Sequence, residues 1–250
     1  MKIVALSDLH GYLPEVETCD VVCICGDIMP LNIQRNIFAS IAWLAGPFQE
    51  WALSLPCNKV IMTWGNHDFI GERLYKYGDY INTDPSWSHG YDGDMQNEIL
   101  FQTNSGLDNR KIVILIDETY KYNGVNFYGT PWCPALNNWA FYGTAEELKE
   151  KFNKIPENTD VLITHCPPKF GQQGIVLQQG WNYLKNFGSQ ELQDAIVNKF
   201  PNRDNKVYVL SGHIHSGNHE IETLDNINYV NVSIKDEHYK DIYKAKIINI

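Results

Sequence analysis

Five short runs rich in β-branched and apolar residues each end in an acidic, amide or imidazole side chain, and this pattern constrains the fold most strongly. Runs of this kind predict β-strands. The residues that follow them are, in chain order, Asp8-Leu9-His10-Gly11, Gly26-Asp27, Gly65-Asn66-His67-Asp68, His165-Cys166-Pro167-Pro168 and Gly212-His213-Ile214-His215. In open α/β sheets, sites form where the carboxyl ends of parallel strands meet. The pattern therefore predicts an α/β fold with one polar site at the strand ends.

The rest of the chain supports the α/β class. Nine runs predict strands, and they cover residues 2–7, 21–25, 59–63, 111–116, 125–128, 160–164, 206–211, 229–232 and 242–248. Apolar residues at helical spacing predict a helix over 33–55, which Pro47 should end or kink. Thr144 with Glu147 predicts a capping box, and Ser189 predicts the cap of a helix that runs to about Phe200. No repeat, low-complexity tract or linker interrupts the chain, so we expect a single domain over residues 1–250.

The residue types at the five strand ends suit a metal ion. Carboxylate, imidazole and amide oxygen bind borderline divalent cations such as Mn, Fe, Zn or Co. The paired residues of Asp8-x-His10 and His213-x-His215 can point the same way from an extended backbone. A single motif would be weak evidence, whereas five in this order are strong. Five of the eight histidines lie in these motifs, and we interpret the other three as surface residues or as neighbours of the site: His89, His219 and His238.

The charge of the chain limits its partners. Lys and Arg number 20 against 30 Asp and Glu, which gives a net charge of −10. This balance argues against affinity built on a general basic surface, although a local phosphate site remains compatible with it. Residues 77–109 contain no Lys or Arg and six acids. That segment is either a long surface excursion or a wall of the substrate pocket.

Targeting signals are not apparent in the sequence. The first eight residues pass directly from strand-like to polar character, without the longer apolar core of a signal peptide. No apolar run approaches the roughly 18 residues of a membrane helix. The six cysteines lack CxxC zinc spacing. We therefore expect a cytoplasmic protein with reduced thiols and no membrane partner.

The five motifs together resemble the signature of the calcineurin-like metallophosphoesterase superfamily, and they span positions 8 to 215. Gly129-Thr130-Pro131-Trp132-Cys133-Pro134, followed by Trp139-Ala140-Phe141, resembles the branch of metallophosphoesterase-domain-containing proteins. The resemblance implies a four-layer α-β-β-α sandwich of two mixed sheets flanked by helices. Some members of that branch lose the first His of the last motif, but His213 is present here, so a full metal site is expected.

The resemblance also implies a role for each motif residue. Two divalent ions (Mn, Fe, Zn, Ni, Co or Mg) would be bridged by Asp27. The other implied ligands are Asp8, His10 and His215 for the first ion, and Asn66, His165 and His213 for the second. A hydroxide bridging the metals would attack phosphorus. His67 would act at the leaving group, and Asp68 would orient its ring, cap the helix that follows, or do both.

The implied reaction is hydrolysis of a small phosphoester: a phosphodiester, a cyclic nucleotide among them, or a phosphomonoester. The net charge makes nucleic acid a less natural substrate. The alternatives are a phosphoprotein phosphatase and a metal-binding scaffold with weak residual activity. Aromatic residues in segments 77–109, 131–142 and 167–181 could stack a base, but Trp132 and Trp139 are equally expected in the core. Cys166 could be a nucleophile, although nothing else in the sequence supports that role.

Overall fold

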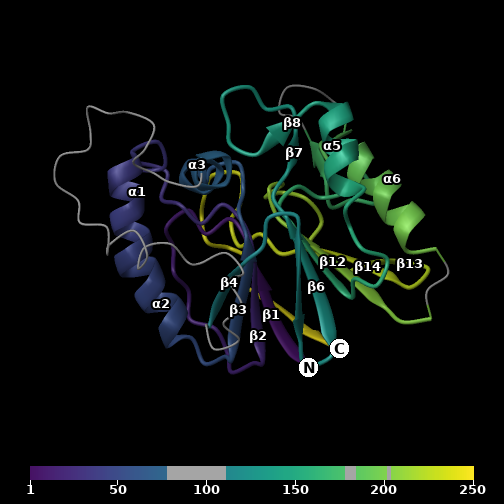
Figure 1. Ribbon diagram of the computed structural model, residues 1–250, viewed down its shortest axis with the longest axis horizontal. Helices are drawn as coiled ribbons and strands as arrows, with labels where there is room; N and C mark the ends of the chain where they lie inside the picture. The colour runs from purple at the N-terminus through teal and green to yellow at the C-terminus, as the bar shows by residue number, and fades with distance from the viewer. Residues whose placement is uncertain (78–110, 178–183, 202–203) are drawn as a thin grey trace.

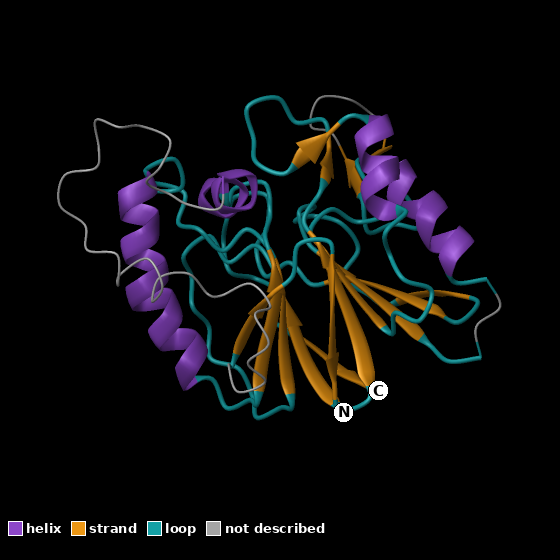
Figure 2. Ribbon diagram, in the orientation of Figure 1, coloured by secondary structure: helices purple, strands orange, loops and turns teal. Residues whose placement is uncertain are grey.

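Two large mixed β-sheets lie face to face, with helices against their outer surfaces (Figures 1 and 2). The computed structural model describes residues 1–77, 111–177, 184–201 and 204–250. The acidic segment 77–109 lies, apart from residue 77, outside the described residues. The predicted four-layer α-β-β-α arrangement is confirmed, and both chain ends lie at the same edge of the sandwich (Figure 1).

The first sheet has the strand order β15-β1-β2-β3-β4. Its strands are β1 (Lys2–Leu6), β2 (Val21–Cys25), β3 (Lys59–Thr63), β4 (Ile112–Ile114) and β15 (Lys246–Asn249). The first four are parallel, and β15 pairs with β1 in the antiparallel sense. The parallel strands thus bring three of the five motifs to one edge.

The second sheet has the order β13-β14-β12-β9-β6-β5. Its strands are β5 (Glu118–Tyr122), β6 (Val125–Thr130), β9 (Val161–Thr164), β12 (Val207–Ser211), β13 (Glu222–Leu224) and β14 (Ile227–Asn231). The two edge strands are antiparallel to their neighbours, and the four inner strands are parallel. Two small ribbons complete the fold: β7 (Cys133–Pro134) with β8 (Tyr142–Gly143), and β10 (Ile175–Leu177) with β11 (Leu184–Asn186).

The central strands are buried on both faces. In β1, Ile3 and Ala5 belong to the cluster between the two sheets, whereas Val4 and Leu6 belong to the cluster beneath the helices. Successive side chains of a strand point to opposite faces, so both faces of such a strand must be apolar. Burial on both faces explains why these strands appear in the sequence as continuous apolar runs.

The helices cover the outer face of each sheet (Figures 1 and 2). Near the first sheet lie α1 (Ile37–Trp43), η1 (Leu44–Phe48), α2 (Gln49–Ser54) and α3 (Phe69–Tyr77). Near the second lie α5 (Ala145–Phe152) and α6 (Gln190–Lys199). The capping box of Thr144 and the cap by Ser189 are both confirmed.

Two sequence predictions need correction. The helix expected over 33–55 begins at Ile37, and it is not broken at Pro47 but passes through it as the π-helical turn η1. A wider turn accommodates a residue that lacks a backbone N–H. The strand expected over 242–248 begins only at Lys246, because the amides of Ile242 and Tyr243 both donate to the carbonyl of Ile234 in a loop.

Candidate metal centre

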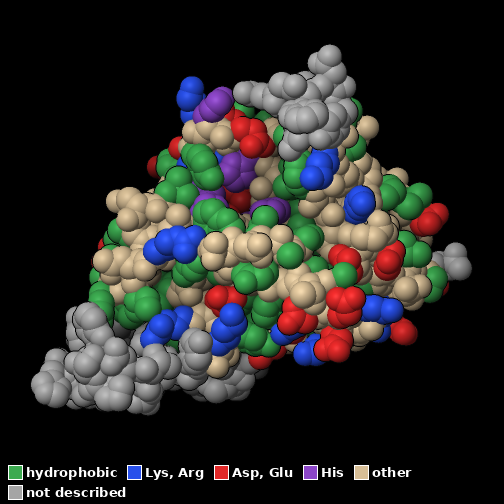
Figure 3. Space-filling model, turned by 90° about the horizontal axis from the view of Figure 1, so that it is seen from above, with side chains coloured by type: hydrophobic (Ala, Val, Ile, Leu, Met, Phe, Trp, Pro, Cys, Tyr) green, Lys and Arg blue, Asp and Glu red, His purple; other side chains and the backbone are tan. Residues whose placement is uncertain are grey.

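The polar residues that follow β1, β2, β3, β9 and β12 converge in one hollow where the two sheets meet. Figure 3 looks onto this edge, and it shows histidine side chains around an acidic group in the hollow, with apolar side chains beside them. The sheets are joined there, since Ser7 after β1 pairs with Ser233 after β14, and the amide of Ile234 donates to the carbonyl of Ser7 at 3.1 Å. All seven predicted ligands contribute to this hollow.

Several of these residues leave their strands through an unusual backbone conformation. Asp8, His10, Asp27 and His213 have φ angles of 59°, 43°, 53° and 68°. Non-glycine residues rarely adopt this left-handed region, and residues that do so gather at functional sites. The amide of Asp8 donates to Gly26 O at 3.0 Å, and the amide of His10 donates to Asp27 O at 2.9 Å. These bonds hold the turns that direct the side chains inward.

Gly65 and Gly212 allow the close approach of the ligands. A Cβ atom at Gly65 would collide with Oδ1 of Asp27 and Cε1 of His165. A Cβ atom at Gly212 would collide with Ser7 and with Oδ2 of Asp8. Only a residue without a Cβ atom leaves room for the carboxylates at these two positions, which explains why the motifs contain glycine there.

Asp8 and His215 form one half of the centre. Asp8 is fully buried, both of its oxygens accept from the amide of His213 at 3.1 Å, and Oδ1 lies 3.4 Å from Nε2 of His215. His215 Nδ1 donates to the carbonyl of Asp236 at 2.9 Å, so Nε2 faces Asp8. Burial alone would lower the pKa of His215, but the attraction of Asp8 raises it to about 9. Burial likewise opposes ionisation of Asp8, yet His215 holds the pKa of Asp8 well below its usual value.

Asp27 lies at the middle of the centre. Its Oδ2 is 3.4 Å from Nε2 of His165 and 3.8 Å from Nε2 of both His10 and His67. His165 donates from Nδ1 to Cys25 O at 2.7 Å, and its Nε2 lies 2.9 Å from Oδ1 of Asn66. Burial would lower the pKa of His165, but Asp27 raises it to about 10. Burial would raise the pKa of Asp27, and the attraction of His165 and His67 holds it well below its usual value.

The remaining imidazoles are held neutral. Burial lowers the pKa of His10 to about 4, and burial together with His165 lowers that of His213 to about 3. Both ring nitrogens of His10 are buried without a hydrogen-bond partner. Buried polar atoms in native proteins are satisfied by some partner. A neutral imidazole with a free ring nitrogen, together with two ionised carboxylates beside it, provides suitable ligands for a divalent cation.

The residues therefore fit the expected pair of cations. Ligand atoms of Asp8, His10 and His215 lie within 4.8 Å of one another, as do those of Asp8, Asp27 and His165. The backbone carbonyls that accept from His165 and His215 fix the ring nitrogen left for a metal, as the outer partners of metal-binding histidines do. The first ion would be held by Asp8, His10, Asp27 and His215, and the second by Asp27, Asn66, His165 and His213.

The carboxylate of Asp68 binds backbone amides and does not orient the ring of His67. Its carboxylate accepts from four backbone amides, at 2.8 Å from Gly65, 2.9 Å from Asp27, 3.0 Å from Ile28 and 3.1 Å from Met29. It therefore ties the turn after β3 to the turn after β2. Burial and the nearby Asp27 raise the pKa of Asp68 to about 7. No contact between this carboxylate and the ring of His67 or the first turn of α3 occurs among the described residues.

Gln34, and not Asp68 as predicted, holds the ring of His67. Its Oε1 accepts from Nδ1 of His67 at 2.6 Å. On the other side, the ring of Trp139 lies 4.3 Å from the imidazole of His67. The ring is thus held between an amide and an indole, with Nε2 toward Asp27. Gln34 lies in no motif, so nothing in the sequence indicated this contact.

Two aromatic side chains form the rim of the centre. Trp139 is one, and Tyr239 is the other, with its ring 4.9 Å from that of His10 and 5.3 Å from that of His215. Tyr239 is 41% exposed and has a φ of 59°. Trp132, by contrast, is a core residue whose Nε1 donates to Asp117 at 2.9 Å. Of the two tryptophans in question, only Trp139 contacts the site.

Among the described residues, His219 and His238 have the positions expected of a neighbour of the site and of a surface residue, and Cys166 has no contact that suggests catalysis. His219 Nε2 donates to the carbonyl of His215 at 2.8 Å, so it is a neighbour of the site. His238 is exposed. His89 lies outside the described residues. The thiol of Cys166 contacts the carbonyls of Pro167 and Phe187, at 3.4 and 3.9 Å, and nothing there supports a nucleophilic role.

Cys133 is a member of the centre that the sequence did not indicate. Its sulfur and ligand nitrogens of His165 and His213 all lie within 4.8 Å of one another. The residue is fully buried, and burial raises the pKa of its thiol well above the usual value. Its sequence context, the run from Gly129 to Pro134, has no metal-binding spacing.

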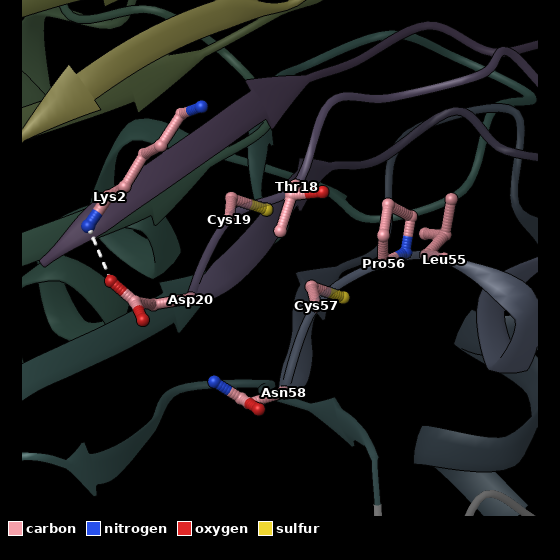
Figure 4. A pocket seen from close by; sticks show the side chains of 8 residues that line it. All are labelled: Lys2, Thr18, Cys19, Asp20, Leu55, Pro56, Cys57 and Asn58. Carbon is pink, nitrogen blue, oxygen red and sulfur yellow. Dashed lines mark hydrogen bonds between the residues drawn. The ribbon is translucent and has the colours of Figure 1, made fainter.

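A second pocket lies at the opposite end of the first sheet (Figure 4). It is lined by Lys2, Thr18, Cys19, Asp20, Leu55, Pro56, Cys57 and Asn58. Lys2 begins β1, and its amide donates to Asp20 at 2.7 Å. Burial raises the pKa of both thiols in this pocket, Cys19 and Cys57. The pocket contains no histidine and lies far along the strands from the motif residues.

A two-sheet sandwich with candidate metal ligands from both sheets is the arrangement expected of a metal-dependent phosphoesterase. The family model described as calcineurin-like phosphoesterase matches residues 1–217, and the chain belongs to that family. The chain is 27% identical over 256 residues to human metallophosphoesterase domain-containing protein 1, covering all of this chain and 71% of the relative. It is 25% identical over 238 residues to UPF0046 protein K07C11.7 of Caenorhabditis elegans, covering 93% and 69%. Both resemblances stated from the motifs are confirmed.

Within the described part of the chain, no helix has the length and apolar character needed to cross a membrane.

Proposed function

We propose that this protein hydrolyses small phosphodiesters, including cyclic nucleotides, at a centre of two divalent metal ions. The observation that carries the proposal is the position of His67 beside the ligand set. Its Nε2 lies 3.8 Å from Asp27 Oδ2, and its ring is held by Gln34 and Trp139. A proton-transfer group fixed next to the metal ligands is what phosphoester hydrolysis requires.

The charge of the centre favours a singly charged substrate. Two carboxylates, Asp8 and Asp27, face two divalent cations, so positive charge remains for a phosphoryl group. Two cationic side chains among the described residues have other partners: Arg35 lies 4.1 Å from the ring centroid of Phe69, and Lys235 is paired with Asp241. A phosphodiester carries one negative charge, and a centre that depends on its metals for positive charge suits that substrate better than a dianionic monoester.

When bound, the metals would activate water and draw charge from the phosphoryl oxygens. The chain supplies the remaining steps. Because Gln34 accepts from Nδ1 of His67, Nε2 is left to exchange a proton with the leaving-group oxygen. Trp139 and Tyr239, on two sides of the histidines, provide apolar surfaces for the two substituents of a diester.

A substrate panel tests the proposal. Metal-stripped protein is loaded with Mn²⁺, Ni²⁺, Co²⁺, Zn²⁺ or Mg²⁺ and assayed with bis(p-nitrophenyl) phosphate, p-nitrophenyl phosphate, cyclic nucleotides, nucleotide anhydrides and a phosphopeptide. We expect hydrolysis of the diester to exceed that of the monoester. Activity confined to the phosphopeptide would instead indicate a phosphoprotein phosphatase. Binding of two metals without any turnover would indicate a metal-binding scaffold.

A cytoplasmic location is part of the proposal. All six cysteines are free thiols, and five of them are buried. Unpaired cysteines in this number are typical of a reducing compartment. Fractionation of the native cells, followed by immunodetection, would test it, and recovery with secreted proteins would contradict it.

A further inference from the structure

Cys133 reaches the second metal position from a side that no predicted ligand occupies. It begins β7, three residues after the end of β6, whereas His165 follows β9 and His213 follows β12. The sulfur and the two ring nitrogens all lie within 4.8 Å of one another. Three separate segments of the chain thus direct a soft or borderline donor at one point.

The three donor atoms are close enough to reach a single ion after small shifts of their side chains. Zinc binds sulfur at about 2.3 Å and imidazole nitrogen at about 2.0–2.1 Å, so two such ligands are at most about 4.4 Å apart. A spread of up to 4.8 Å requires only small shifts of three side chains. Asp27 and Asn66 approach His165 with oxygen donors, and Asn66 Oδ1 lies 2.9 Å from its Nε2. His165 therefore has oxygen donors beside its Nε2 and belongs to the same cluster as the Cys133 sulfur.

The surroundings of the thiol leave its sulfur available to an ion. Cys133 is fully buried, and its contacts are with Pro131 O at 3.8 Å and with the thiol of Cys166. Both are weak, because sulfur is a poor hydrogen-bond donor and acceptor. His165 has its Nδ1 committed to Cys25 O, which leaves Nε2 on the side of the ion. A buried sulfur without a strong partner, beside two imidazoles, is suited to coordination.

We propose that Cys133 is a thiolate ligand of the second metal ion, alongside His165 and His213, and that it selects zinc, iron or cobalt over magnesium at that position. The inference rests on the proposed two-metal centre. Thiolate is a soft ligand that magnesium does not favour, whereas zinc and the later transition metals bind it well. On binding, the S–H bond breaks, a sulfur–metal bond forms, and one proton is released to solvent.

The thiolate also changes the charge offered to a substrate. With Asp8 and Asp27 it makes three anionic ligands against two divalent cations, so the centre is one unit less positive than with the two carboxylates alone. A less positive centre favours the single negative charge of a phosphodiester over the double charge of a monoester. The ligand thus links the choice of metal to the preference for diesters over dianionic monoesters.

Cobalt spectroscopy tests the proposal directly. Metal-stripped protein is titrated with Co²⁺, and we expect two ions per chain with a sulfur-to-cobalt charge-transfer band in the near ultraviolet. In Cys133→Ser this band should disappear while the protein still binds cobalt. Cys166→Ser is the matched control, since Cys166 is also buried and adjoins His165. The cobalt-loaded Cys166→Ser variant should retain the charge-transfer band. Far-ultraviolet circular dichroism of each variant checks that it is folded.

X-ray absorption of the wild-type zinc protein needs no variant. We expect a sulfur neighbour at about 2.3 Å, averaging half a sulfur per zinc over the two ions. Two bound ions without a sulfur neighbour or a charge-transfer band would overturn the role of Cys133 and leave the proposed function intact. A band that persists in Cys133→Ser would also overturn it. Failure to bind any metal would refute the two-metal centre itself.

Discussion

Among the described residues, His67 is the motif histidine with a ring nitrogen hydrogen-bonded to a side chain outside the predicted ligand set, that of Gln34. Its proposed role is proton exchange, not coordination, so His67→Ala should lower kcat by roughly 10²–10⁴-fold while metal content stays near two per chain. Elemental analysis of the variant, together with kcat for a diester, separates these effects. Asp27→Ala is the contrasting variant, because Asp27 lies in both ligand sets and its loss should reduce both metals. If His67→Ala loses metal, His67 is a ligand and the assignment is wrong.

Gln34 acts on the reaction through the ring of His67, so it is a positioning residue. Gln34→Ala removes the acceptor for Nδ1 and should lower kcat about tenfold with little change in KM, because the metal ligands and the rim are left in place. Gln34→Glu keeps an oxygen acceptor and should recover much of kcat. Steady-state kinetics of the two variants provide the test. A rise in KM alone, or equal losses in both variants, would show that Gln34 does not orient the ring.

At the scale of single elements, the capping box of α5 gives a stability prediction. Thr144 Oγ1 accepts from the amide of Glu147, and the Glu147 carboxylate accepts from the amide of Thr144. Thr144→Ala should therefore lower the free energy of unfolding by about 1 kcal/mol, measured by urea denaturation. Thr144→Ser, which keeps the hydroxyl, is the control.

The carboxylate of the same capping box sets the pH dependence of its contribution. The backbone and side-chain hydrogen bonds of Thr144 lower the pKa of Glu147 from 4.5. A lowered pKa in the folded state means that the stabilisation is present above the unfolded pKa and is lost as pH falls through the folded one. The stability difference between wild type and Glu147→Gln should accordingly vanish in acid. A difference that persists at low pH would contradict this account.

The elements differ in how far the sequence predicts them. Strands β2 and β3 have the bounds expected from the sequence, because burial on both faces makes all of β2 and the three middle residues of β3 apolar. Strand β5 was not expected, because it is an edge strand whose exposure alternates and whose identity depends on pairing with β6. The π-helical turn at Pro47 and the loop before β15 likewise depend on tertiary contacts that no local pattern encodes.

The same limit applies to the metal centre. The motif residues were predictable because they follow strands, and their division between two ions came from the family resemblance. Gln34 and Tyr239 reach the centre from loops and Cys133 from the two-residue strand β7, so no spacing in the sequence marks them. Asp68 was misassigned because it is adjacent to His67 in the chain, while the turn after β3 directs its carboxylate to backbone amides instead.

At the scale of the whole molecule, the residues of the candidate metal centre come from both sheets. Asp8, Asp27 and Asn66 follow strands of the first sheet, and His165, His213 and His215 follow strands of the second. A cation bound by both sets stabilises the folded chain relative to the unfolded one by an amount that grows with its concentration over Kd, about 2.7 kcal/mol at a hundredfold excess. For a domain of this size, that corresponds to a rise in Tm of roughly 5–10 °C.

Thermal unfolding of the chelator-treated protein, with and without added Zn²⁺ or Mn²⁺, measures this linkage. We expect Tm to rise with metal concentration in the wild type, and to rise much less in Asp27→Ala, which removes the bridging carboxylate. His238→Ala is the matched control, since this histidine is exposed and should leave the metal response unchanged. A single unfolding transition that shifts as a whole would show that the cations couple both sheets. If metal leaves the wild-type Tm unchanged, cations do not bind across the two sheets at this centre. The negative charges of Asp8 and Asp27 must then be balanced by protonated His165 and His215, which the raised pKa values of these two histidines allow.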